Sequence, residues 1–163
     1  MRVLIIILLV VAGEWVHAQS PTTFILLRHA EKVNDGTGDP ELSEAGVLRA
    51  KNLMNLLQKN AIDAIYSTPY KRTRNTVMPL ATTRMLPVQD YDGLTMEQID
   101  HMIGKHGGGT VLVVGHSNTI PGIVNFLTGK NEYKNFEETE YGNLIIVTVF
   151  EKGKKTSVTW ITY

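Results

Sequence analysis

Cysteine is absent from the 163-residue sequence. The chain therefore has no disulfide bonds and no thiol nucleophile. An excess charge of one sign is absent too, because 16 Lys and Arg residues balance 16 Asp and Glu residues. Without a net positive field, neither nucleic acid nor an anionic membrane surface is expected as a partner. Any site for an anion must then come from cations gathered locally.

Long apolar runs are also scarce, and the first one is the uncharged segment 3–12 near the N-terminus. A membrane-spanning helix needs about 20 apolar residues, and Glu14 interrupts this one. The segment Val16-His17-Ala18 fits the small-x-Ala cleavage pattern, so residues 1–18 are predicted to be a signal peptide that is removed before Gln19. An uncleaved N-terminal anchor is the alternative.

The predicted export indicates a bacterial periplasmic or secreted protein without stable membrane insertion after signal removal. No cysteine follows the apolar run, which excludes a lipid-anchored lipoprotein. The rest of the chain has an ordinary globular composition, with 43% hydrophobic and 20% charged residues. Its length predicts one domain over residues 19–163.

Short apolar runs alternate with segments of helical spacing along this domain. Strands are predicted at 23–27, 61–67, 110–114, 143–150 and 156–163, and a strand followed by a loop is predicted at 86–92. Helices are predicted at 44–59, from Pro69 to about Pro79, at 95–106 and at 119–129. Strand–helix alternation favours right-handed βαβ units. We therefore predict an α/β fold: a three-layer α/β/α sandwich with a mostly parallel central sheet and an antiparallel C-terminal hairpin strand.

Polar side chains with recognisable chemistry follow three of the predicted strands. Arg28 and His29 follow the first strand, Ser67 and Arg72 follow the second, and His116 follows the fourth. The carboxyl ends of parallel strands lie at one edge of a sheet, where such folds bind ligands. Two Arg and two His side chains suit a tetrahedral dianion, with backbone N–H groups of the following helices as further donors. The alternative is a solvated Arg-His pair without a ligand.

These residues stand in motifs that resemble those of the histidine phosphatase superfamily, which has the phosphoglycerate mutase-like fold. The motifs are Arg28-His29-Ala30, the Ser67, Arg72 and Thr76 spacing, Val113-Val114-Gly115-His116, and the helix entry Leu42-Ser43-Glu44-Ala45-Gly46. The resemblance extends over essentially all of residues 19–163.

The resemblance implies a mechanism without metal or cofactor. His29 would be the nucleophile and would form a phosphohistidine that water then hydrolyses. Arg28, Arg72 and His116 would form the phosphate pocket and hold the phosphoryl oxygens. His29 must be neutral to attack, and the flanking cations favour its neutral form.

The general acid is the open role. In the family, a carboxylic acid after the third strand often protonates the leaving oxygen, and this segment offers Asp90, Asp92 and Glu97. Asp92 is the preferred candidate, although Asp92-Gly93 can simply form a turn. Some small family members have no acid at this place.

Three further residues have weaker assignments. The resemblance assigns Asn34 to the phosphate pocket, in the loop that follows the first motif. Lys32 and Ser117 are near enough in sequence to touch a substrate, and are as readily explained as solvated loop residues.

The implied activity is hydrolysis of phosphomonoesters, with a phosphorylated small molecule or a phosphopeptide as substrate. A phosphohistidine or phosphoprotein phosphatase stays an alternative. A mutase would need a lid and a bisphosphorylated intermediate, and a non-catalytic phosphate-binding module would not need His29. The loops 31–41, 89–97 and 130–142 would choose the leaving group, and their sequences name no particular molecule.

Overall fold

The computed structural model describes residues 20–163. The strands are β1 Thr22–Arg28, β2 Ala64–Ser67, β3 Val88–Asp90, β4 Thr110–Gly115, β5 Asn143–Glu151 and β6 Lys155–Thr162. The helices are α1 Glu44–Leu57, α2 Lys71–Arg84, α3 Met96–Lys105 and α4 Thr119–Thr128.

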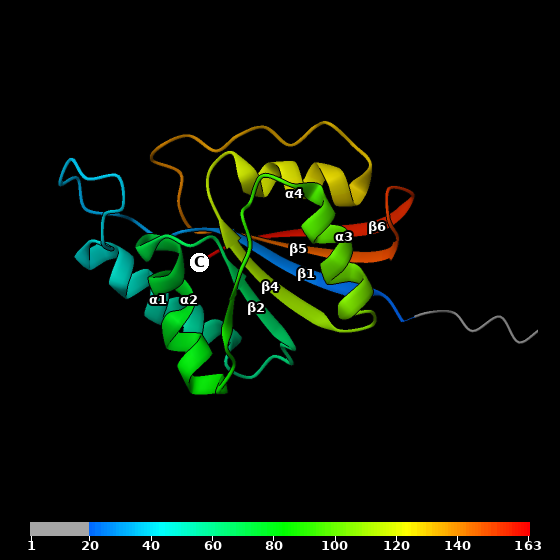
Figure 1. Cartoon of the computed structure of the whole chain (residues 1–163), viewed down its shortest axis with the longest axis horizontal. Helices are drawn as coiled ribbons and strands as arrows, with labels where there is room; N and C mark the ends of the chain where they lie inside the picture. The colour runs from blue at the N-terminus through cyan, green and yellow to red at the C-terminus, as the bar shows by residue number, and fades with distance from the viewer. Residues whose placement is uncertain (1–19) are drawn as a thin grey trace, which may run out of the picture.

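The described strands form one mixed sheet in the order β3-β2-β4-β1-β5-β6 (Figure 1). β1 pairs parallel to β4, and β2 lies parallel to both β3 and β4. β5 runs antiparallel to β1 and to β6, which confirms the C-terminal hairpin. The carboxyl ends of β1, β2 and β4 therefore reach the same edge of the sheet.

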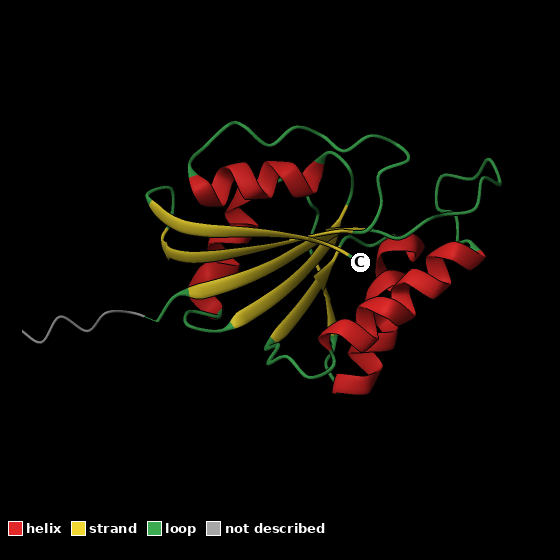
Figure 2. Ribbon diagram, turned by 180° about the vertical axis from the view of Figure 1, so that it is seen from behind, coloured by secondary structure: helices red, strands yellow, loops and turns green. Residues whose placement is uncertain are grey.

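Helices cover the sheet on both faces, which confirms the predicted three layers (Figure 2). Alternate residues of β1 point to opposite faces. Phe24 and Leu26 pack in the cluster that includes residues of α3 and α4. Ile25 and Leu27 pack in the second cluster, together with residues of α1 and α2. The middle strand thus supplies both halves of the core and is held rigidly behind the residues that follow it.

Helix α2 is longer than its sequence predicts. The expectation that it stops near Pro79 is wrong, because it continues to Arg84 and ends at Met85, which has the left-handed φ of 52°. A helix-interior proline costs about 3 kcal/mol. Val77 and Leu80 flank it and are fully buried, and burying a Val or Leu side chain stabilises by about 1.5–3 kcal/mol each. Packing against the sheet therefore outweighs the helix-breaking effect of the proline.

The predicted signal peptide and its cleavage site lie outside the described residues and stay predictions. Among residues 20–163, no helix combines the length and the apolar character that crossing a membrane requires.

Candidate active site

A polar cavity of about 300 Å³ opens where β1 and β4 end. It is lined by Arg28, His29, Lys32, Thr37, Gly38, Pro40, Arg72, His116, Ser117, Asn118 and Glu138. The structure thus brings the four predicted residues Arg28, His29, Arg72 and His116 together in one cavity. Their catalytic roles remain predictions that this geometry makes specific.

His29 is held with a defined tautomer. Its backbone N–H donates to the Gly115 carbonyl oxygen at 2.9 Å, and its Nδ1 lies 2.8 Å from the Ala30 carbonyl oxygen. A carbonyl oxygen can only accept, so Nδ1 carries the proton. The lone pair of neutral His29 therefore lies on Nε2, which is the atom available as a nucleophile.

His29 is also kept neutral by its surroundings. Burial lowers its pKa to about 3, although the hydrogen bond to the Ala30 carbonyl opposes the shift. The positive charges of Arg28, His116 and Arg72 lower the pKa further. Near pH 7 the imidazole is therefore neutral, with Nε2 unprotonated, as nucleophilic attack requires.

His116 faces His29 at a ring-centroid distance of 5.5 Å and ends a directed chain of hydrogen bonds. Its Nε2 lies 2.9 Å from the Thr68 hydroxyl, which donates to the Thr73 hydroxyl at 3.1 Å. Thr73 in turn bonds the backbone carbonyls of Thr68 and Tyr70, each at 2.8 Å. Since Thr68 uses its own proton on Thr73, it accepts from His116, and Nε2 of His116 carries a proton.

The neutral form of His116 is favoured as well. Burial lowers its pKa to about 4, and the charges of Arg72 and Arg28 lower it further. With Nε2 donating to Thr68, Nδ1 of His116 is free to take up a proton when an anion enters the cavity and offsets these charges.

Arg28 is almost completely buried, and only some of its N–H donors have hydrogen-bond partners. Its Nη1 donates to the backbone carbonyls of Glu137 and Glu140 at 2.7 and 3.0 Å, and its Nη2 lies 3.4 Å from a Glu138 carboxylate oxygen. The guanidinium carbon lies 4.3 Å from the ring centroid of Tyr141. Its buried Nε has no hydrogen-bond partner among residues 20–163. Donors of Arg28 therefore remain for a ligand.

Arg72 repeats this pattern on the other side of the cavity. Its guanidinium carbon lies 4.4 Å from the Tyr70 ring centroid, and its Nη1 reaches the Gly38 carbonyl at 3.4 Å. Its Nε is also buried and unpartnered within the described part of the chain. A buried donor without an acceptor costs about 1–3 kcal/mol. Two such N–H groups beside one cavity indicate a site built for an anion.

The two arginine motifs are tied together by Thr76. The Ala30 N–H donates to the Thr76 hydroxyl at 2.9 Å, and this hydroxyl donates to the Arg72 carbonyl at 2.7 Å. Thr76 is fully buried, so these bonds are shielded from water. The segment after His29 is thereby fixed to α2, the helix that supplies Arg72.

Two of the expected donors are hydrogen-bonded within the protein. Ser67 is fully buried and its hydroxyl donates to the Thr68 carbonyl at 2.8 Å. The backbone N–H of Lys71 at the start of α2 donates to the Asp39 carboxylate at 2.9 Å. The loop before α1 therefore caps the first N–H of α2, and the expectation that this helix N-terminus contributes donors to an anion stays a prediction.

Asp92 has the contacts of a capping carboxylate. Its Oδ1 accepts from the backbone N–H groups of Leu94 and Thr95 at 2.8 and 3.0 Å, and the Thr95 hydroxyl donates to it as well. These hydrogen bonds lower the pKa of Asp92, whereas a general acid needs a raised pKa. Asp92 lines a smaller cavity next to the first, together with Arg72 and His116. The geometry favours the turn alternative, and the general-acid assignment stays a prediction.

Of the remaining residues that the sequence suggested for the site, two line the cavity and three do not. Lys32 and Ser117 line the cavity. Asn34 is exposed and is not among the cavity-lining residues. Asp90 forms an ion pair with Arg74 on the surface. Glu97 is exposed in the first turn of α3.

Four residues of the site were not predicted from the sequence: Tyr70, Tyr141, Thr68 and Glu138. Tyr70 and Tyr141 lie against the guanidinium groups of Arg72 and Arg28. Glu138 belongs to the connection between α4 and β5, which runs back along α4 (Figure 1). Its side chain lines the cavity. The cluster of three glutamates in 137–140 was the available signal for this segment.

The side chains that the structure describes around this cavity do not form a recognisable metal-binding site. Within residues 20–163, no three His, Asp or Glu side chains gather in a way that would hold a metal ion.

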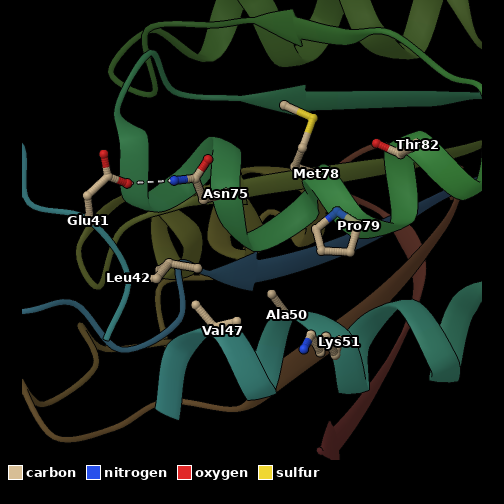
Figure 3. A pocket seen from close by; sticks show the side chains of 9 residues that line it. All are labelled: Glu41, Leu42, Val47, Ala50, Lys51, Asn75, Met78, Pro79 and Thr82. Carbon is tan, nitrogen blue, oxygen red and sulfur yellow. Dashed lines mark hydrogen bonds between the residues drawn. The ribbon is translucent and has the colours of Figure 1, made fainter. Parts of the chain in front are cut away.

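A larger cavity of about 440 Å³ lies between α1 and α2 (Figure 3). Its lining is mainly apolar and includes Leu42, Val47, Met78 and Pro79. Glu41 and Asn75 are hydrogen-bonded to each other across one end at 2.7 Å. It has neither an arginine nor a histidine in its lining, so it lacks the chemistry of the polar cavity.

Comparison with known proteins agrees with this geometry. Residues 24–95 match the sequence model of the histidine phosphatase superfamily (branch 1). A curated relative, phosphoserine phosphatase 1 from Hydrogenobacter thermophilus, is 40% identical over 83 residues, which are 47% of this chain and 38% of that protein. The match thus spans well under half of the length of the curated relative.

Solved structures share the fold over most of the described chain. The protein histidine phosphatase SixA, complexed with tungstate, matches with a TM-score of 0.70 and 19% identity over 86% of this chain and 96% of that one. A phosphoserine phosphatase from Entamoeba histolytica, in complex with phosphoserine, matches with a TM-score of 0.69 and 16% identity over 85% and 95%. At these identities the likeness concerns the fold.

Proposed function

Since the chain belongs to the histidine phosphatase superfamily, we propose that it is a phosphatase that hydrolyses phosphomonoesters through a phosphohistidine on His29. One observation carries the proposal: two buried arginine Nε–H groups without partners in residues 20–163 flank a histidine whose pKa is lowered to about 3. The first feature suits the binding of a phosphoryl group, and the second suits nucleophilic attack on it.

In the first step, Nε2 of His29 attacks phosphorus in line with the leaving oxygen. The N–P bond forms and the P–O bond breaks with its electron pair on the leaving oxygen, which takes up a proton from water or from an acid of the site and leaves as the alcohol. Arg28 and Arg72 donate to the equatorial oxygens, and His116 donates from Nδ1 once it is protonated. These donors are fixed by their own contacts before substrate arrives, so little reorganisation is needed during the reaction.

In the second step, water attacks phosphorus, the N–P bond breaks and phosphate leaves. The Ala30 carbonyl keeps the proton on Nδ1 throughout, so Nε2 is regenerated as a lone pair. All the positive charge around the phosphoryl group comes from side chains, and the proposed reaction is therefore independent of metal.

The proposed substrate is a phosphorylated small molecule or a phosphopeptide. A second candidate class is the phosphoramidate of a protein phosphohistidine. The position of Asp92 favours this class, because its carboxylate is committed to Leu94 and Thr95. A phosphoramidate with a good leaving group depends less on an acid than an alkyl ester does.

Export is part of the proposal and is supported by the apolar segment 3–12 and by Ala18. Protein recovered from an export-competent bacterial host is expected to begin at Gln19, which N-terminal sequencing measures. Intact Met1 in a membrane fraction would indicate an anchor instead.

The activity is tested by replacing the nucleophile. His29→Ala should abolish hydrolysis of p-nitrophenyl phosphate in the presence of a chelator, because no N–P bond can form. The wild type, quenched during turnover, should hold acid-labile phosphate on His29, as detected by mass spectrometry.

His101→Ala is the matched control, since His101 is exposed on α3, and it should keep full activity. Residual turnover in His29→Ala well above background would remove His29 as the nucleophile. Activity that disappears with the chelator and returns with a divalent metal would contradict the metal-independent mechanism.

A further inference from the structure

Among the residues that line the polar cavity, Glu138 is the one carboxylic acid. It lies far in sequence from Asp90 and Asp92, the carboxylates of the segment after β3. Those two are committed elsewhere: Asp90 to Arg74, and Asp92 to the start of α3. Glu138 therefore occupies a place where a proton donor could reach a bound phosphate ester.

The backbone around Glu138 is fixed to the floor of the cavity. A turn is closed by the Glu140 N–H, which donates to the Glu137 carbonyl at 2.9 Å. The same Glu137 carbonyl and the Glu140 carbonyl both accept from Nη1 of Arg28, at 2.7 and 3.0 Å. The Arg28 side chain is only 2% exposed. A buried group of the phosphate pocket thus sets the position of the turn that carries Glu138.

The Glu138 side chain itself is free to serve a ligand. Its carboxylate lies 3.4 Å from Nη2 of Arg28, and the side chain is 81% exposed. Solvent around the exposed carboxylate screens its attraction to Arg28. Arg28 is already held by two carbonyls and by the Tyr141 ring. The negative charge of Glu138 is therefore not needed to keep Arg28 in place.

We propose that Glu138 is the general acid of this site, and this inference rests on the proposed phosphatase function. A phosphoryl group held by Arg28 would lie beside the Glu138 carboxyl group, because both residues line the same cavity and their side chains are 3.4 Å apart. In the proposed role, the carboxylic acid form of Glu138 donates to the leaving oxygen of the ester.

The proton balance of the two steps follows. As Nε2 of His29 bonds to phosphorus and the P–O bond breaks, Glu138 gives its proton to the leaving oxygen, which departs as an alcohol. Glu138 is now a carboxylate. In the second step it accepts a proton from the attacking water, whose oxygen bonds to phosphorus while the N–P bond breaks. Phosphate leaves, and both His29 and Glu138 are restored.

The test compares substrates whose leaving groups differ in basicity. General acid catalysis contributes about 10²–10⁴-fold for a poor leaving group and little for a stable anion. Glu138→Gln keeps the size of the side chain and removes its acid. It should lower kcat/KM for ethyl phosphate by about 10²–10⁴-fold, lower it less for phenyl phosphate, and change it only a few-fold for p-nitrophenyl phosphate.

Two matched variants separate Glu138 from its neighbours. Glu132→Gln changes an exposed glutamate earlier in the same connection, which is paired with Lys130 and not with the cavity, and it should leave the rates for all three substrates unchanged. Asp92→Asn tests the competing assignment and should show no dependence on the leaving group. If Asp92→Asn shows that dependence and Glu138→Gln does not, Glu138 is the wrong residue.

Failure of the inference is distinguishable from failure of the proposed function. Equal losses on all three substrates in Glu138→Gln would mean that Glu138 only positions Arg28, and would overturn the inference. Wild-type protein that hydrolyses the aryl esters but not ethyl phosphate would overturn it too. If the wild type hydrolyses none of them and no phosphate can be trapped on His29, the proposed function itself fails.

Discussion

At the scale of single residues, the site without a bound anion keeps two imidazoles uncharged beside two guanidinium groups. His29 is 4% exposed, and desolvation is the largest cause of its lowered pKa. Desolvation is likewise the largest cause at His116. A charged imidazole would both lose its nucleophilic lone pair and repel the arginines. The burial that keeps His29 in the neutral form required by the proposed nucleophile therefore also makes its protonation unfavourable for the folded state.

This coupling predicts how stability depends on pH. The pKa of His29 is about 3 in the folded protein and near 6.5 in the unfolded chain. As the pH falls below 6.5, the unfolded chain binds a proton that the folded protein does not, so the free energy of unfolding decreases. The decrease is at most about 1.4 kcal/mol per pH unit for one histidine, and it ends near pH 3. Above pH 6.5, His29 does not change the free energy of unfolding with pH.

Urea unfolding at pH 7 and pH 4.5 measures the effect. His29→Gln should lose less stability than the wild type on going from pH 7 to pH 4.5. Carboxylates such as Glu31, whose pKa is lowered by Arg49, also lower stability in acid, but they do so equally in both proteins. The exposed His101→Gln is the control and should retain the wild-type decrease. Equal decreases in His29→Gln and the wild type would show that His29 titrates normally.

The residues that sequence reasoning identified are those whose role follows from chain position. Arg28, His29 and His116 stand at strand ends, and parallel pairing alone brings such ends together. Asp92 is different, because the role of a carboxylate depends on which donors it faces. Its sequence context is compatible with a general acid and with a turn. Only the folded backbone shows that Oδ1 accepts hydrogen bonds from the N–H groups of Leu94 and Thr95.

At the scale of elements, hydrophobic patterns were sufficient for nearly every helix and strand. A continuous apolar run such as 110–114 is typical of a strand in a sheet that is covered on both faces. The observed β4 is accordingly buried from Val111 onwards. The C-terminal end of α2 was harder to predict from the sequence. Local propensity ends a helix at Pro79, whereas the burial of Val77 and Leu80 that overrides it is a property of the packed sheet.

The connection 129–142 was the least predictable element. It contains no helix or strand, so its sequence has no hydrophobic periodicity from which its position could be predicted. Its position is fixed by long-range contacts instead: Arg28 to the Glu137 and Glu140 carbonyls, and the Phe136 N–H to the Ser117 carbonyl at 3.0 Å. Glu138 could not be assigned from the sequence because nothing local places it near Arg28.

At the scale of the whole molecule, the segment that carries His29 is tied to distant parts of the chain. The Glu31 carboxylate accepts from Arg49 of α1 through Nε and Nη2, with the shortest distance at 2.6 Å. Nη1 of Arg49 donates to the Tyr163 carbonyl at 2.5 Å. The Glu31 carbonyl accepts from the Ser43 N–H at 2.9 Å. Helix α1 therefore links the loop after His29 to the C-terminal strand.

Gly46 makes this link possible, because it lets helix α1 approach the Glu31 backbone closely. A Cβ at position 46 would lie 2.1 Å from the Glu31 carbonyl oxygen, which is backbone and cannot rotate away. Gly46→Ala must push α1 and Glu31 apart and should destabilise the fold by about 1–3 kcal/mol. A shift of about 1 Å in a catalytic group can cost about 10²-fold in rate, so kcat should fall by up to that factor.

Gly104→Ala is the matched control, because it makes the same change in helix α3 at a site with no atom within 4 Å of the new Cβ. Alanine is favoured over glycine inside a helix by about 0.5–1 kcal/mol, so this variant should be slightly more stable and fully active. Urea unfolding and p-nitrophenyl phosphate turnover measure both effects. If Gly46→Ala lost stability but kept its kcat, the contact between α1 and Glu31 would support the fold without positioning His29. If both variants behaved alike, the close approach at Gly46 would not constrain the molecule at all.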